Sequence, residues 1–410
     1  MVVWGMRVTG IGFWGWMFVL VSLSLGIGVY LVLWVQLPMQ ALVANSNPEQ
    51  ILQRITVGVR LRDNSKVPSR TCNMNSCFNW SRCVTNRSVE YPKVYLYPQT
   101  GLLRRWYQQM RSALARSSYV ARNPDEACLF FPGFDISCDS NNKTEAEDTF
   151  TKKLRELKHW HGGLNHMIFE FSDWPAPIFD VDSAMLFRSN SVDYTFREGF
   201  DESIPILFAK DYSYVRRSST SSNDSEQSVA EARKYLAVFK GSRYSQSCPS
   251  VRTLLPRLHD PLQGIIISTK CYHWPPEDNT PCDLLPEATH WAEYSYEALI
   301  TNSLFCLVPE GCGSHSYRLF EALSLGCIPV VLADHYVPPY RTLVEWKEIA
   351  IFFPVSQYQA LPKFLRSLPP QRISLMRRKG MEVYDKHFSS PDAIIKSLLA
   401  VLGKRIAEHL

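Results

Sequence analysis

Arg318 and Glu321 are the residues of this chain whose types and spacing best suit the chemistry of a phosphorylated ligand. They follow a glycine-rich segment, GCGSHS at 311–316, inside the stretch NSLFCLVPEGCGSHSYRLFEALSLGCIPVVLADHYVPP at 302–339. Residues three apart share one face of a helix, where an arginine can pair with a diphosphate and a carboxylate can accept hydrogen bonds from ribose hydroxyls. The alternative is an ordinary surface ion pair on a helix between two strands.

The elements that must position these two residues are a strand before the glycines, a helix, and a second strand. LFCLVP at 304–309 and IPVVL at 328–332 are short apolar runs typical of strands buried on both faces. Ser314 or Ser316 can cap the intervening helix, and Gly326 ends it. Such a unit brings the free N–H groups of a helix start to the carboxyl edge of a parallel sheet, where phosphates bind.

The same alternation of strand and helix runs through most of the chain and predicts parallel sheets covered by helices on both faces. A serine-rich, polar connection at 211–229 separates two such alternating regions. Strands are expected at VYLYP (from 94), ACLFFPG (from 127), HMIFEF (from 166), IPILF (from 204), YLAVF (from 235) and GIIIS (from 264). Helices are expected at 101–118, 145–160, near 249–258, at YSYEALIT (from 294), near 359–367, 371–386 and 391–407.

The N-terminus predicts a membrane anchor. Residues 11–35 contain no charge and are long enough to span a bilayer with some tilt. Arg7 is the only charge before them and Glu49 is the next one after, so the bulk of the chain is expected on the luminal side. A cleaved signal peptide is the alternative, but its apolar core would be shorter. We therefore expect a cytosolic tail at 1–10, a signal anchor at 11–35 and a stem at 36–70.

Composition is that of a globular protein in an oxidising compartment. The chain has 410 residues, 46% hydrophobic and 20% charged, and a net charge of +5 that permits an anionic partner without indicating nucleic acid. Eleven cysteines favour disulfides over zinc, because no paired cysteine–histidine spacing is present. Four N-x-S/T acceptors agree with a luminal location: Asn79, Asn86, Asn142 and Asn223.

The block at 302–339 resembles the signature of the exostosin glycosyltransferases, which share FCL-P-G, an R-x-x-EA helix and a GC-x-PV strand. The resemblance extends to GGLNHMIFEF at 162–171, FDESIPIL at 200–207 and RKYLAVFKGSRY at 233–244, and is strongest to the glucuronyl-transferring half of animal heparan sulfate polymerases. It implies a GT-B-type α/β fold of two doubly wound, Rossmann-like lobes facing a cleft. The expected lobes are 71–228 on the acceptor side and 229–388 for the nucleotide sugar, followed by a C-terminal helix at 389–410.

Sugar transfer from a nucleotide diphosphate needs positive charge on the leaving group. Arg318 is the first candidate, supported by the backbone at Ser314–Tyr317, and Arg243 in FKGSRY is the next; Lys240 ranks lower. Glu321 is the ribose candidate. His315 either contacts a phosphate or fills a turn position. The expected donor-binding set is therefore Arg243, Ser314, His315, Tyr317, Arg318 and Glu321.

The reaction also needs a base for the acceptor hydroxyl. Asp135 follows an expected strand in the N-terminal lobe and is our candidate, with a helix-cap or turn role as the alternative and Asp139 and Asp201 as fallbacks. Asp180 and Asp182 have the spacing of a metal-binding pair, but Asp182 precedes SAMLF and is interpreted as a helix N-cap. Since the resemblance also implies a metal-independent lobe, no metal site is expected.

Disulfides are predicted from position together with the resemblance. Cys306 and Cys327 begin the strands before and after the helix, and adjacent parallel strands can bring them within bonding reach. The other expected pairs are Cys72–Cys77, Cys83–Cys128 and Cys271–Cys282, which leaves Cys138, Cys248 and Cys312 unassigned.

Three functions follow from the resemblance. The first is a type II membrane inverting transferase of the Golgi or endoplasmic reticulum that moves glucuronate from UDP-glucuronate onto a heparan-type glycosaminoglycan. The second keeps the fold but uses UDP-galactose, UDP-xylose or UDP-arabinose; in its favour, the turn at 310–313 is Glu-Gly-Cys-Gly, where the heparan-polymerising relatives carry arginines. The third is a non-catalytic subunit. The absence of a second transferase domain in this chain implies hetero-oligomerisation with another glycosyltransferase.

Overall fold

The structure is a computed structural model that describes residues 14–21, 31–38, 72–83, 91–135, 143–173, 177, 179–206, 233–244, 250–273, 288–289 and 291–409. The chain divides into two compact units, Met1–Arg60 and Leu61–Leu410. The predicted connection at 211–229 and the acceptors Asn86, Asn142 and Asn223 lie outside the described residues, whereas the Asn79 side chain caps a short 3-10 turn by accepting the N–H of Ser81.

The first unit contains an antiparallel pair of strands, β1 (Trp14–Val21) and β2 (Leu31–Pro38). The sequence predicts one membrane helix over 11–35, so the structure differs from that expectation. The valines and aromatic residues within the described positions 14–21 and 31–38 favour strands. Within the described part of the chain, no helix has the length and apolarity needed to cross a bilayer. Membrane anchoring stays a prediction.

The N-terminal half of the second unit, residues 91–206, is built on short parallel strands. They pair in the order β3-β4 and β5-β6-β7, and a parallel bridge between Phe130 and His166 joins the two sets. The residues of β4 to β7 are buried, as the apolar runs predict, whereas Tyr95 and Leu96 of β3 are half-buried. The strands are β3 (Val94–Leu96), β4 (Leu129–Phe131), β5 (Met167–Glu170), β6 (Met185–Arg188) and β7 (Glu202–Ser203), and the helices are α3 (Arg105–Arg116) and α4 (Lys143–Arg155).

Two local expectations in this half were wrong. The segment after Asp182 is strand β6 rather than a helix, because MLFR fills a buried position in the sheet between β5 and β7. Asp182 is therefore not a helix N-cap. The last strand lies at Glu202–Ser203, just before the predicted IPILF.

The C-terminal half, residues 233–388, is organised around a six-stranded sheet with the order β10-β9-β8-β11-β12-β13. All neighbours are parallel except β10 and β9. The predicted strand, glycine-rich loop, helix and strand are confirmed as β11, α8 and β12. The strands are β8 (Tyr235–Tyr244), β9 (Ile265–Tyr272), β10 (Ala288–Thr289), β11 (Ser303–Pro309), β12 (Ile328–Leu332) and β13 (Ile351–Phe352).

The helices of this half follow the predicted pattern closely. The one exception is the helix expected near 249–258, where the structure has two 3-10 turns at Val251–Thr253 and Leu255–Leu258. Pro256 removes a backbone donor that a longer helix would need. The helices are α7 (Tyr296–Thr301), α8 (Tyr317–Ser324), α9 (Leu361–Arg366), α10 (Pro370–His387) and, beyond residue 388, α11 (Pro391–Ala407).

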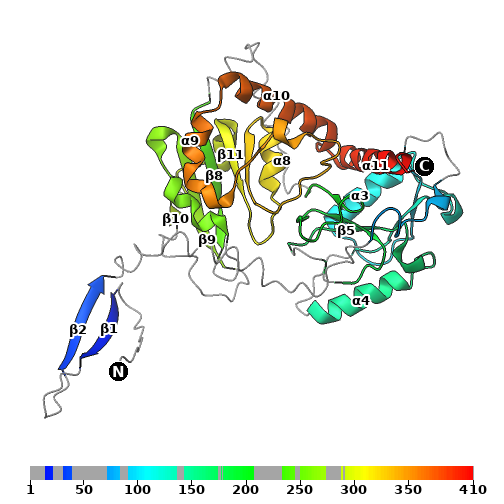
Figure 1. Cartoon of the computed structure of the whole chain (residues 1–410), viewed down its shortest axis with the longest axis horizontal. Helices are drawn as coiled ribbons and strands as arrows, with labels where there is room; N and C mark the ends of the chain where they lie inside the picture. The colour runs from blue at the N-terminus through cyan, green and yellow to red at the C-terminus, as the bar shows by residue number, and fades with distance from the viewer. Residues whose placement is uncertain are drawn as a thin grey trace. The chain divides into compact units, whose positions relative to one another are not determined.

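The last helix returns the chain to the N-terminal half. Figure 1 shows α11 beside α3, and the two helices pack against each other. Arg405 of α11 donates to the carboxylate of Glu202 at 2.7 Å and to the carbonyl of Phe200 at 2.8 Å. One apolar cluster extends from α3 and the first sheet through α11 to Phe320 of α8. The two halves therefore share a core.

Three predicted disulfides are confirmed: Cys72–Cys77, Cys83–Cys128 and Cys306–Cys327, with Cα atoms 5.4, 4.6 and 5.8 Å apart. The last of these links β11 to the residue before β12. Cys271 and the unassigned Cys312 are also disulfide-bonded. Cys138, Cys248 and Cys282 lie outside the described residues.

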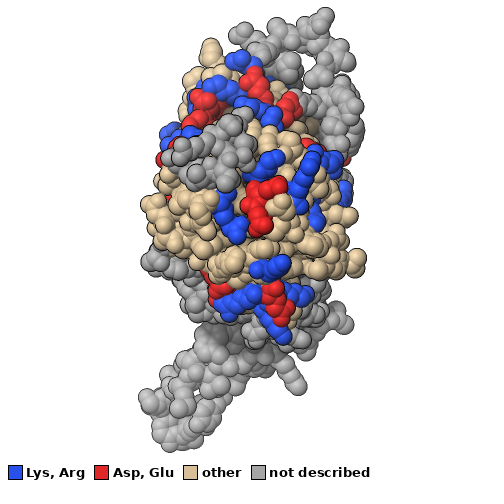
Figure 2. Space-filling model, turned by 90° about the vertical axis from the view of Figure 1, so that its right-hand side faces the viewer, with Lys and Arg blue, Asp and Glu red and all other residues tan. Residues whose placement is uncertain are grey.

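The surface charge is mixed, as the small net charge of +5 suggests. On the face drawn in Figure 2, lysines and arginines are interspersed with aspartates and glutamates over the described part of the chain.

Candidate donor site

The strand order of the second sheet marks a place for a ligand. The chain moves from β8 outward to β9 on one side, and then returns to the other side of β8 with β11. In parallel α/β sheets, ligands bind outside the carboxyl ends of the strands at such a reversal. The ends of β8 and β11, at Tyr244 and Pro309, therefore define the candidate site.

The glycine-rich loop leads directly from β11 into α8. Of the two predicted caps, Ser316 takes the role, because its Oγ accepts the N–H of Arg318 at 3.3 Å. The N–H of Ser314 donates instead to the side-chain oxygen of Asn190, at 2.8 Å, in the N-terminal half. The start of α8 thus lies beside the ends of the two strands, as the sequence predicts.

Arg318 contacts β8 at Phe239 and Lys240, before the end of the strand at Tyr244. Its Nε and Nη2 donate to the carbonyl of Lys240 at 3.3 and 3.1 Å, and its Cζ lies 5.2 Å from the centre of the Phe239 ring. A Cβ on Gly241 would approach Arg318 Nη2 to 2.5 Å, so only glycine leaves room for this guanidinium. Glu321 has a different partner, since it accepts a hydrogen bond from the hydroxyl of Tyr296.

Two further arginines lie at the same edge. Arg243, on β8, is fully buried at 0% exposure. Arg252, in the first 3-10 turn after β8, donates to the carbonyls of Pro309 and Glu310 at 3.2 and 3.0 Å. Burial, and then the nearby charge of Arg318, lower the pKa of Arg252 to about 10. Arg252 is therefore a buried cation held at the end of β11.

Arg252 was missed by the sequence reasoning. It lies in SCPSVRTLL, which has neither a glycine-rich turn nor an adjacent strand. The available signal was its place in the first turn of the element that follows β8, where a side chain can reach back over the strand end. Lys240, the lower-ranked candidate, has partners of its own. Its Nζ donates to the carbonyls of Trp291 and Tyr294 at 2.8 and 2.5 Å.

Glu321 and Tyr317 of α8 border the arginines. The Glu321 residue is only 8% exposed. Burial raises the pKa of Tyr317, and the negative charges of Asp173 and Glu321 add to the effect. Tyr317, a member of the predicted donor-binding set, is therefore close to Asp173, which belongs to the N-terminal half and follows β5.

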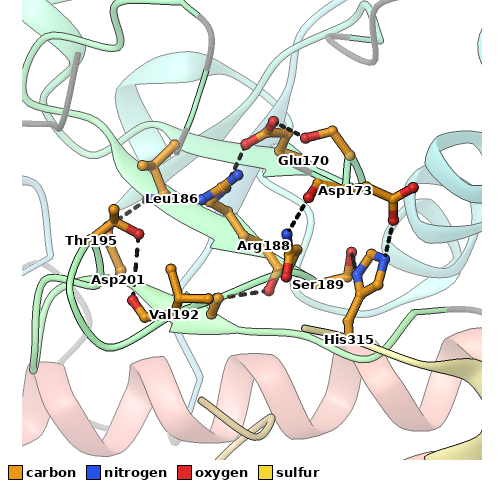
Figure 3. Close-up of polar contacts among 12 residues, drawn as sticks. Glu170, Asp173, Leu186, Arg188, Ser189, Val192, Thr195, Asp201 and His315 are labelled. Atoms are coloured by element: carbon orange, nitrogen blue, oxygen red, sulfur yellow. Dashed lines mark hydrogen bonds and ion pairs between the residues drawn. The ribbon is translucent and has the colours of Figure 1, made fainter. Parts of the chain in front are cut away.

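Residues of the N-terminal half contact the glycine-rich loop directly, as Figure 3 shows. His315 lies within hydrogen-bond distance of the Asp173 carboxylate at 2.8 Å and of the Ser189 hydroxyl at 2.9 Å. The same view shows Arg188 paired with Glu170 at 2.5 Å, a buried ion pair that stiffens the adjacent strand ends.

The candidate bases have varied surroundings. Asp135 accepts the backbone N–H of Arg104, the residue before α3, at 2.9 Å. Its role as a base stays a prediction. Asp201 is buried, pairs with Arg197 at 2.7 Å and accepts the N–H of Leu186 at 2.9 Å, so its carboxylate is committed to the fold. Asp139 lies outside the described residues.

The aspartate pair is neutralised by an arginine. Arg155 contacts Asp180 at 2.6 Å and Asp182 at 2.8 Å, and Trp160 Nε1 donates to Asp182 at 2.8 Å. A cation would have to displace the guanidinium. Among the described residues, no group of three or more histidine, cysteine, aspartate or glutamate side chains is arranged to hold a metal ion.

Comparisons with known proteins extend these observations. Residues 70–368 match the Exostosin GT47 domain. The chain is 30% identical to Exostosin-1 homolog of Caenorhabditis elegans, over 85% of this chain and 93% of that protein. It is 31% identical to Exostosin-1 of Drosophila melanogaster, over 82% of this chain and 46% of that protein, and 28% identical to Exostosin-1a of Danio rerio, over 91% and 51%. The chain thus spans about half the length of the fly and fish proteins.

A solved structure, the S. aureus MnaA-UDP co-structure, aligns with 72% of this chain and 95% of its own at 10% identity and a TM-score of 0.33. A score of that size does not distinguish a shared fold from a partial overlap of α/β units.

Proposed function

The chain belongs to the exostosin GT47 family of glycosyltransferases, and from that premise we propose that it transfers a sugar from a UDP-sugar donor to a glycan acceptor. The observation that carries the proposal is the group of arginines near the point between β8 and β11 where the strand order reverses. Arg318 contacts β8 at Lys240, and Arg252 contacts the end of β11, next to the start of α8. A diphosphate bound there meets guanidinium groups beside the positive end of the α8 dipole.

The mechanism follows from where charge develops. As the sugar–phosphate bond breaks, negative charge builds on the diphosphate, and cations fixed in advance stabilise that charge without reorganising. Arg318 is fixed by the Lys240 carbonyl and the Phe239 ring. Glu321 serves the ribose hydroxyls, with Tyr296 orienting its carboxylate. The acceptor hydroxyl gives its proton to a carboxylate of the N-terminal half, for which Asp135 is the sequence candidate.

The arrangement we propose is GT-B-type, with the donor site in the C-terminal half and the acceptor on the N-terminal side. The parallel sheet in each half supports it. Direct displacement by the acceptor, with inversion at the sugar, and phosphate stabilisation by arginine instead of a metal remain part of the proposal.

We propose glucuronate as the donor sugar, on the strength of the Exostosin-1 relatives, and a heparan-type glycosaminoglycan as the acceptor. The turn at 310–313 favours testing other UDP-sugars, because it contributes Glu310 and no arginine. Part of the missing charge is supplied by Arg252, which contacts the carbonyl of Glu310 at 3.0 Å.

The proposed location is the lumen of the Golgi or endoplasmic reticulum, with a single-pass type II anchor. The disulfides support an oxidising compartment, and the uncharged run at 11–35 supports the anchor. A hetero-oligomer with a second glycosyltransferase is proposed because an alternating polymer needs two transferase activities.

The test is a donor screen of the full-length chain, alone and co-expressed with a second exostosin-family transferase. UDP-glucuronate, UDP-galactose, UDP-xylose and UDP-arabinose are offered with a heparan-type oligosaccharide, and Arg318→Ala is the matched control. Transfer of glucuronate by the wild type and its loss in the variant support the proposal. Transfer of another sugar replaces the donor, and no transfer together with no UDP binding favours the non-catalytic subunit.

A further inference from the structure

His315 is held entirely by the N-terminal half, although it belongs to the glycine-rich loop of the C-terminal half. Its Nε2 lies 2.8 Å from Asp173 Oδ1, and its Nδ1 lies 2.9 Å from Ser189 Oγ. The histidine is 7% exposed, and the Asp173 side chain is 69% exposed. Figure 3 shows the imidazole between these two partners.

Asn190 makes a second connection at the same place. Its Nδ2 donates to the carbonyl of Asp173 at 2.6 Å, and its Oδ1 accepts the N–H of Ser314 at 2.8 Å. A Cβ on Gly313 would lie 3.0 Å from Asn190 Nδ2 and 3.1 Å from the Asp173 carbonyl. The glycine therefore permits the close approach of the two segments.

Two other roles for His315 do not fit this geometry. Contact with a phosphate would require a ring nitrogen, and both are within hydrogen-bond distance of protein partners. An aspartate–histidine–serine arrangement suggests a nucleophile, but Ser189 is 0% exposed and cannot reach an external substrate. Because both ring nitrogens contact the N-terminal half, the histidine is suited to hold its own loop in place.

That loop sets the start of α8. Ser316, next to His315, caps the helix, and Arg318 follows two residues later. We propose that His315 is a positioning residue: through Asp173 and Ser189 it fixes the glycine-rich loop against the N-terminal half, so that UDP affinity depends on the contact between the halves. This inference rests on the proposed function, because it assigns a role within the same donor site.

The chain offers a matched control. His335, which follows β12, pairs with Asp193 of the N-terminal half at 3.0 Å, and the pair spans the same sequence separation of 142 residues. Both side chains of the control pair are exposed, at 50% and 59%. It joins the halves without belonging to the glycine-rich loop.

The experiment measures UDP binding to the full-length chain by isothermal titration calorimetry. His315→Ala should weaken UDP affinity by about tenfold or more, since the loop loses two hydrogen bonds, one of them to a charged group. His335→Ala should stay within about twofold of the wild type, because an exposed pair contributes little. His315→Gln, whose amide can still donate to Asp173, should recover part of the affinity.

Asp173→Asn tests the contact from its exposed side, so the inference does not depend on the folding of one variant. It should weaken UDP binding in the same direction, by about threefold or more, as the hydrogen bond to a charge becomes a neutral one. Equal affinity of His315→Ala and wild type, or equal losses in His315→Ala and His335→Ala, would overturn the inference. A wild type that binds no UDP would overturn the proposed function itself.

Discussion

Replacing Arg318 by alanine removes a guanidinium that the fold holds in place before any donor binds. Two of its nitrogens donate to the Lys240 carbonyl at 3.3 and 3.1 Å, and the Phe239 and Tyr296 rings lie 5.2 and 5.9 Å from its Cζ. Because these contacts fix the orientation of the charge, little reorganisation is needed as charge builds on the leaving diphosphate. We therefore expect Arg318→Ala to slow mainly the chemical step of sugar transfer.

The expected loss of transition-state stabilisation is that of removing one preorganised hydrogen-bond donor while the neighbouring arginine remains. Loss of such a donor typically costs about 2.7–4 kcal/mol of transition-state stabilisation. Arg252 stays in place and compensates in part, so we expect about 2–4 kcal/mol, which is a fall in kcat/KM of about 30- to 1000-fold. Arg318→Lys should recover little, because a point charge does not reproduce a fork of donors that also stacks on two rings.

The assay is sugar transfer from the donor identified in the screen, with UDP affinity measured on the same samples. Arg116→Ala is the control, since Arg116 forms an exposed pair with Asp392 at 2.8 Å, far along the chain from the donor loop. Wild-type turnover and wild-type UDP affinity in Arg318→Ala would refute the reasoning. The helix would then be structural only, and the non-catalytic subunit would become the leading interpretation.

Glu321→Gln should weaken UDP binding by about 1–2 kcal/mol, because a charged acceptor for ribose hydroxyls becomes neutral while the Tyr296 hydroxyl keeps a partner; unchanged calorimetric affinity would exclude the ribose role. Burial lowers the pKa of His166 from 6.5 to about 4, so the unfolded chain takes up the proton first as the pH falls. Stability should therefore decline between pH 6.5 and 4 by up to about 3 kcal/mol, and urea titrations of a His166→Phe variant should show a smaller decline than the wild type. Asp135→Asn should keep UDP affinity and the hydrogen bond from the Arg104 N–H but lower turnover by roughly 100-fold if Asp135 is the base; normal turnover would end that assignment.

The sequence was sufficient to predict structure that depends on residues close together along the chain. The apolar runs of β11 and β12, the glycines between them and the cap at Ser316 act within a few residues, and the structure follows the predicted strand, loop, helix and strand. The disulfide between Cys306 and Cys327 followed from the same unit, because adjacent parallel strands begin side by side. The arginine and the carboxylate on α8 were found for the same reason.

Local patterns did not decide the structure where one segment suits both a helix and a strand. SAMLF after Asp182 was interpreted as a helix, yet a strand forms there because β5 and β7 provide pairing partners on both sides. The apolar run at 11–35 has the length of a membrane helix and also the valines and aromatic residues of strands, and β1 and β2 occupy parts of it.

Tertiary structure alone decided which distant segments complete the site. Arg252 reaches the end of β11 only because the sheet order brings β8 next to it. His315 meets Asp173 across 142 residues, and α11 returns to α3 from the far end of the chain. Composition, periodicity and spacing carry information about residues that are close together along the chain. These contacts depend instead on how the N-terminal and C-terminal halves of the second unit share a core. The sequence by itself therefore determined the strand, loop and helix that carry the candidate donor-site residues, and the packing of the two halves decided what holds that helix in place.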